Sequence, residues 1–221
     1  MCRHIAVLLA LLPASLFAQE RATLRPERDH AYRVAQNARY SMALTLGQSP
    51  QTYLAQKEAS LAHARSEFER FLILPRAAKA ALEAAADDRA ERYALEALQL
   101  VRRTAMPDRV GAEGHRWGVR TDAVFYGNLV LGRLAVLHGD VESARRHLLL
   151  AGQAWGDATL DNDGPNMSLA RELLLASERD TVIQFLEECR RFWRNDEGKI
   201  DLWEAQIQRG EMPTFGLNLF F

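Results

Sequence analysis

The chain has 221 residues, of which 28 are Lys or Arg and 29 are Asp or Glu, so its formal net charge is −1. This balance argues against a general nucleic-acid partner and against binding to an anionic membrane surface. The length is typical of a single domain that is large enough to bury a core.

Residues 1–18 have the pattern of a secretory signal peptide. A basic start precedes an apolar run over 5–12, Pro13 then breaks the helix, and the small Ala18 stands before a cleavage point. The alternative is a membrane anchor, but the run is shorter than the roughly 20 residues that span a bilayer. We therefore expect a bacterial protein exported to the periplasm or cell envelope, with no membrane span in the mature chain and one domain over 19–221.

Helical spacing begins near residue 28, and no alternating run typical of a β-strand follows it. The first predicted helix covers 28–46 and ends at Gly47. The segment 51–73 also has its apolar residues on one helical face, and Pro75 is expected to stop or kink that helix. The apolar residues of this face are Leu54, Leu61, Phe68, Phe71 and Leu72.

A first helical hairpin is predicted over 76–104, with Asp87 and Asp88 between its two helices. Ala90 and Ala97 stand seven residues apart on the second helix. Small residues at this spacing allow two helices to approach closely. An irregular loop is expected over the following residues, 105–117, because glycine and proline recur there.

A second hairpin is predicted from helices over 119–138 and 140–154, where Ala144 and Ala151 repeat the seven-residue spacing. Small residues on the first of these helices would complete the same seam. This unit has the clearest pattern in the chain, so it serves as the reference for the other two.

A third hairpin is predicted around Ser177–Asp180, with Val182 and Cys189 in the places of Ala144 and Ala151. Cys189 is therefore expected to be a buried small hydrophobic residue and not a reactive thiol. A last helix is predicted over 199–209, and an apolar tail that packs back on the end of the stack follows it.

Within 125–158, the residues Leu131, Gly132, Gly139, Ala144, Leu148 and Ala151 stand at the spacing of a tetratricopeptide repeat. The segment resembles such a repeat, although Asn128 and Ala135 replace its usual Trp and Tyr. More loosely, 120–221 resembles the C-terminal part of exported bacterial helical-repeat proteins of unknown function, which implies no activity. The resemblance implies an all-α fold of divergent tetratricopeptide-like hairpins, stacked in a short right-handed solenoid.

No catalytic or metal-binding motif stands out in the sequence. The histidines lack the spacing of a helical zinc site. The acidic loops around Gly164 and Gly198 lack the first carboxylate of a calcium-binding loop, so Asp161, Asp163 and Asn166 are interpreted as turn and cap residues. No cofactor is expected, and an enzyme is the least favoured class.

Aligning the three hairpins on Ala90, Ala144 and Val182 places a cation at one shared position on each first helix. In a tetratricopeptide hairpin the first helix lines the concave face, so the three cations would face one groove and the solvent. They could bind a carboxylate, such as a peptide C-terminus, by charge-assisted hydrogen bonds, although a solvated helix face often carries arginine as well. The predicted binding residues are Lys79, Arg133 and Arg171, with Tyr126, Leu129 and Met167 beside them.

These patterns lead to one expected function and one alternative. The first is a non-catalytic scaffold that binds a protein or peptide in the groove between its hairpins. The alternative is a structural subunit of an envelope assembly that packs through its apolar C-terminal end.

Overall fold

The computed structural model describes residues 46–103, 109–110, 116–117 and 120–220. The predicted signal peptide over 1–18 and most of the helix predicted over 28–46 lie outside these ranges. Within them the chain forms nine α-helices that pack against one another, one 3₁₀ turn, and a pair of two-residue strands. The prediction of an all-α class is confirmed.

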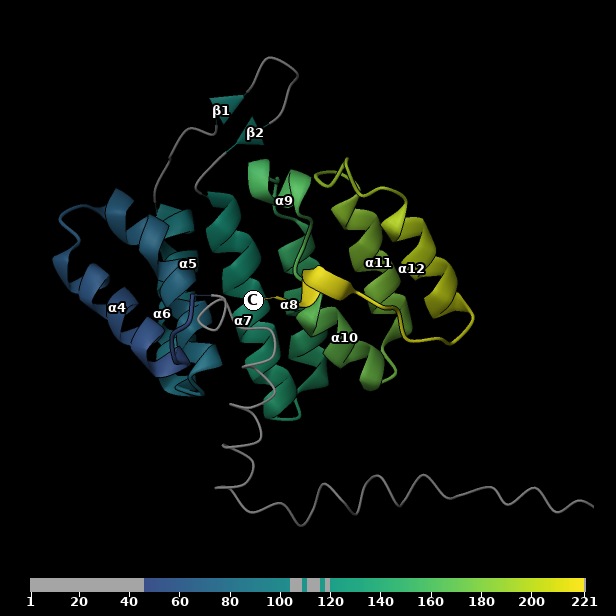
Figure 1. Cartoon of the computed structure of the whole chain (residues 1–221), viewed down its shortest axis with the longest axis horizontal. Helices are drawn as coiled ribbons and strands as arrows, with labels where there is room; N and C mark the ends of the chain where they lie inside the picture. Colours follow the sequence, from purple (N-terminus) through teal and green to yellow (C-terminus); the bar gives the residue numbers. More distant parts are fainter. Residues whose placement is uncertain (1–45, 104–108, 111–115, 118–119, 221) are drawn as a thin grey trace, which may run out of the picture.

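The helices extend across the molecule from α4 at one end to α12 at the other (Figure 1). The strands β1 and β2 pair antiparallel within the segment predicted as an irregular loop. The elements are α4 (Pro50–His63), α5 (Glu67–Glu83), α6 (Asp87–Arg103), β1 (Arg109–Val110), β2 (Arg116–Trp117), α7 (Arg120–Leu137), α8 (Val141–Gly152), α9 (Ala158–Asn162), α10 (Ser168–Leu175), α11 (Arg179–Cys189), α12 (Lys199–Gln208) and η1 (Gly216–Leu219).

The single helix predicted over 51–73 is wrong, because the chain breaks between α4 and α5. Ser66 caps α5 by accepting a hydrogen bond from the backbone N–H of Glu69, and the Glu69 carboxylate accepts one from the backbone N–H of Arg65. The helix then continues through Pro75 instead of ending there. Of the predicted apolar face, Leu54, Leu61 and Phe71 are buried, whereas Leu72 is partly buried and Phe68 is exposed.

The three predicted hairpins share one turn. In each, three residues join the helices, and the middle residue has a positive φ: 54° at Ala85, 76° at Gly139 and 67° at Ser177. In each turn the next backbone N–H donates to a carbonyl five residues earlier, as in a Schellman motif. These bonds are Ala86 N to Ala81 O (2.8 Å), Asp140 N to Ala135 O (2.9 Å) and Glu178 N to Leu173 O (2.9 Å).

The residues used to align the hairpins are structurally equivalent. Ala90, Ala144 and Val182 each follow the positive-φ residue by five positions, and each is completely buried. Ala97, Ala151 and Cys189 are completely buried as well. The alignment made from sequence therefore places the same turn and the same buried seam in all three units.

Packing between hairpins follows a regular order. The first helices of the hairpins lie beside one another, because α7 packs against both α5 and α10. The second helix α8 packs against the second helix α11. The second helix α6 instead packs against α7, the first helix of the next hairpin. Successive hairpins therefore bury their apolar faces on each other, and the core runs continuously from α4 to α12.

The tail packs on the last helix, as predicted, only through its first part. Phe215 is buried against Trp203, with ring centroids 5.0 Å apart, and the chain then turns back toward the start of α10. In Figure 1 the 3₁₀ turn η1 lies over the region of α8 and α10. Tertiary contacts of the aromatic cluster direct this return, since the tail has no helical periodicity to extend the stack.

Candidate functional site

The three predicted cations lie at equivalent positions on the first helices of the hairpins. Lys79 is on α5, Arg133 on α7 and Arg171 on α10, and each precedes its aligned buried residue by eleven positions. Their environments differ, because each hairpin presents different neighbours to the shared position.

Lys79 is half-buried against Tyr126, and its Nζ lies 4.0 Å from the centroid of the phenol ring. Burial lowers the pKa of the Lys79 amine to about 8, although the nearby carboxylates of Glu83 and Asp122 favour its charged form. The structure thus brings together two of the predicted site residues in a cation–π contact. Their position is enclosed and not an open groove wall.

Arg133 forms an ion pair with Glu172 of α10. Its Nε and Nη2 lie 2.9 and 2.8 Å from Oε1 of Glu172, and the two side chains are 14% and 24% exposed. The expectation that Arg133 faces water is therefore wrong. The pair joins two neighbouring first helices, which gives Arg133 a structural role that the aligned sequences did not predict.

Arg171 differs from the other two cations in being exposed on α10. Leu129 and Met167, predicted to line the groove beside the cations, are completely buried in the core. Their apolar side chains face the packing between hairpins, so they do not provide a surface for a ligand. The predicted binding residues therefore do not form one surface. Lys79 and Tyr126 contact each other, Arg133 is paired with Glu172, and only Arg171 is exposed.

A pair of carboxylates that the sequence did not predict includes Asp122, which interacts with Lys79. Asp122 of α7 and Asp157, which precedes α9, are close enough to share a hydrogen bond. Burial raises the pKa of Asp122, and the adjacent Asp157 raises it further, while Lys79 opposes the shift. Asp157 also accepts a hydrogen bond from the backbone N–H of Leu160. No local spacing connects these residues, so only the tertiary structure shows the group.

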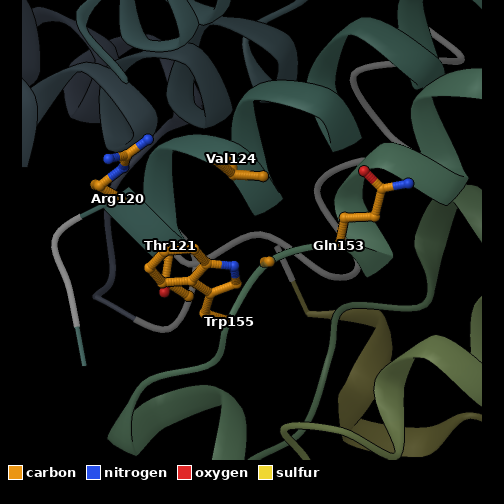
Figure 2. Close-up of a pocket in the computed structure, with 6 residues that line it drawn as sticks. Arg120, Thr121, Val124, Gln153 and Trp155 are labelled. Atoms are coloured by element: carbon orange, nitrogen blue, oxygen red, sulfur yellow. The ribbon is translucent and has the colours of Figure 1, made fainter. Parts of the chain in front are cut away.

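A small pocket of about 110 Å³ opens between the start of α7 and the segment that leaves α8. Figure 2 shows the indole of Trp155 beside Thr121, with Val124 and Gln153 around the cavity. Thr121 donates a 2.8 Å hydrogen bond to the carbonyl of Gly156, which fixes this wall. The pocket is mostly apolar, and its size suits a single side chain of a binding partner better than a cofactor.

Among the residues that the structure describes, no group of three His, Cys, Asp or Glu side chains is arranged to hold a metal ion. Over the same residues, none of the helices has both the length and the apolar character needed to cross a bilayer. Cys189 is completely buried, and burial raises the pKa of its thiol well above the usual value.

Comparisons of the chain with protein-family models, with curated proteins and with solved structures gave no match.

Proposed function

We propose that this protein is a non-catalytic scaffold that binds a protein or peptide, and that its hairpins form a divergent tetratricopeptide-like solenoid. The observation that carries the proposal is the shared turn of the three hairpins, each with a buried small or β-branched residue at the same place. Stacked repeats of this kind create extended surfaces, which such proteins use for binding.

The binding surface that this proposal assigns is the face formed by the neighbouring first helices α5, α7 and α10. Lys79 and Arg133 already interact with acidic or aromatic groups of the same molecule. Arg171 is exposed on the same set of helices, so we assign to it the contact with an acidic group of the partner.

The test is affinity capture from envelope extracts with residues 19–221 as bait. Arg171→Glu is expected to reduce the captured partner at least tenfold, and higher salt should weaken the wild-type interaction because exposed charges are screened. Arg146→Glu is the matched control, because Arg146 is exposed on α8, a second helix. Equal capture by both variants would contradict the assigned surface.

Export to the periplasm or cell envelope belongs to the same proposal. It rests on the charged start, the apolar run and Ala18 in the sequence. Intact-mass measurement on protein from the exported fraction should give a chain that begins at Gln19. A cytosolic protein that keeps Met1 would contradict export.

A structural subunit remains a second candidate, because large apolar side chains are exposed around the C-terminal helix and tail. Leu202 is 55% exposed and Leu217 is 81% exposed. If these residues join copies or neighbours in an assembly, Leu202→Ser together with Leu217→Ser should abolish it. Light scattering of the purified chain at micromolar concentration decides this, since a monomeric wild type argues against self-assembly.

A further inference from the structure

The C-terminal tail binds back to the loop that precedes α10, and the contact is built around Asn218. The side-chain Nδ2 of Asn218 donates to the carbonyls of Asp163 (2.9 Å) and Pro165 (3.1 Å). The carbonyl of Asn218 accepts from the backbone N–H of Met167 at 2.6 Å. One tail residue therefore contacts both acceptors and a donor of the same short loop.

The other half of the contact comes from the loop side. Asn166, which is 4% exposed, donates from Nδ2 to the carbonyl of Phe220 at 2.5 Å. Its Oδ1 accepts from the backbone N–H and the hydroxyl of Ser168, which fixes the amide in place. Met167 is the N-cap residue of α10, and its own side chain forms no cap hydrogen bond. Asn166 satisfies the N–H of Ser168, and the tail satisfies the N–H of Met167.

The tail is held in two different ways along its length. Pro213 and Phe215 are buried, and the Phe215 ring packs on Trp203. After Phe215, the segment Gly216–Phe220 has no completely buried side chain: Leu219 is partly buried against the core, and hydrogen bonds hold Asn218 and Phe220. Hydrogen bonds exchanged with water add little net stability, so this segment can open while Phe215 stays in place.

From this geometry we infer that the surface formed by residues 163–167 is a binding site for an extended peptide, and that Gly216–Phe220 is a displaceable latch that fills it. The peptide class that fits is the one seen in the contact: an extended segment whose asparagine pairs with backbone groups and is followed by apolar residues. A partner protein presenting such a segment replaces the latch.

This inference rests on the proposed scaffold function and specifies part of its surface. Arg171, the exposed cation assigned to the partner, lies one helical turn after Met167 on α10, and its backbone N–H donates to the Met167 carbonyl. The latch contact at Met167 and the exposed cation are thus four residues apart in the chain.

The first experiment measures hydrogen exchange in the full chain. The Met167 amide, bonded to the latch, is expected to exchange at least 100-fold faster than the Leu173 amide, which lies inside α10. Equal exchange rates for the two amides would show that the tail opens only when the domain unfolds, and would overturn the latch.

The second experiment uses a fluorescein-labelled peptide of residues 213–221 and two truncated chains, one ending at Gly216 and one at Gly210. The peptide is expected to bind the truncated chains at least tenfold more tightly than the full chain. A peptide carrying Asn218→Ala should bind at least tenfold more weakly, because it loses both side-chain hydrogen bonds.

Circular dichroism establishes that each truncated chain is folded. The chain ending at Gly216 keeps Phe215 and its packing on Trp203. If the shorter chain does not fold, the chain ending at Gly216 alone is used to test whether the peptide binds the latch site. For this chain the readout is restored protection of the Met167 amide at millimolar peptide. No restored protection, or equal binding by the Asn218→Ala peptide, would overturn the site. Peptide binding with no effect of Arg171→Glu on envelope capture would instead count against the proposed function alone.

Discussion

Gly132 of α7 lies directly against the side chain of Leu169 of α10, so closely that a Cβ atom on Gly132 would collide with a Leu169 methyl group. The same atom would lie 3.1 Å from Cβ of His147 on α8. Three helices from two hairpins therefore meet at a position where only glycine fits. Gly132 is one of the small residues that the sequence pattern predicted between the helices of the second hairpin, and the helices approach closely there.

Gly132→Ala is expected to destabilise the protein by about 1–3 kcal/mol, because the added methyl group overpacks a completely buried contact. The matched control is Gly127→Ala on the same helix, where the new Cβ would lie 3.1 Å from the flexible Leu98 side chain. The better helix propensity of alanine favours both variants equally, so the milder steric contact at Gly127 should give the smaller change. Denaturant unfolding of both variants measures the difference, and equal stabilities would contradict it.

Cys189 is expected to be unreactive in the native protein. It is completely buried on α11, and the raised pKa of its thiol keeps it protonated at neutral pH. In a Cys2→Ser variant, a thiol reagent should label the native chain at least about 100-fold more slowly than the unfolded chain, since only the thiolate reacts. Labelling at the same rate in both states would show that Cys189 is accessible.

The Arg133–Glu172 pair should contribute to stability, in contrast to the other cations at the shared position. Arg133→Ala leaves a largely buried Glu172 without this partner, so a loss of about 1–3 kcal/mol is expected. Arg171→Ala, at the equivalent position on α10, should change the free energy of unfolding by less than about 0.5 kcal/mol because Arg171 is exposed. Comparable losses of stability for the two variants would show that the Arg133–Glu172 ion pair does not cause the loss in Arg133→Ala.

The pKa of Lys79 predicts a specific dependence of stability on pH. Its pKa is about 8 in the folded protein against 10.5 for an unperturbed lysine, so unfolding takes up a proton between these values. Raising the pH from 8 to 10.5 should therefore add stability through this group. Replacing Lys79 by Met should reduce that gain by about 1–3 kcal/mol, and identical pH profiles for wild type and variant would contradict it.

Some features could be predicted because they depend on neighbouring residues in the chain. The turn at Gly139 and the buried positions of Ala90, Ala144 and Val182 follow from local spacing and from the need for small residues where helices approach. The three helical hairpins could be predicted for the same reason. Pro75 was misread, because proline occupies an interior position of α5 and the chain breaks earlier, where Ser66 provides a cap.

The candidate site could be predicted only in part. The spacing correctly identified equivalent positions for Lys79, Arg133 and Arg171, since it follows from the repeat. It also placed Tyr126 beside the cations, where the structure has it against Lys79. It did not predict Glu172 opposite Arg133, because that partner comes from another helix. Arg133 and Glu172 are 39 residues apart, and the neighbouring hairpin alone brings them together.

By itself, the sequence determined the all-α class, the three hairpins and the small residues between their helices, because helical periodicity and turn geometry act over a few residues. Only the tertiary structure decided that Leu129 and Met167 belong to the core, that Asp122 meets Asp157, and that the tail returns to α10. These contacts depend on which surfaces the packed hairpins present to each other, and no local pattern in the chain specifies that.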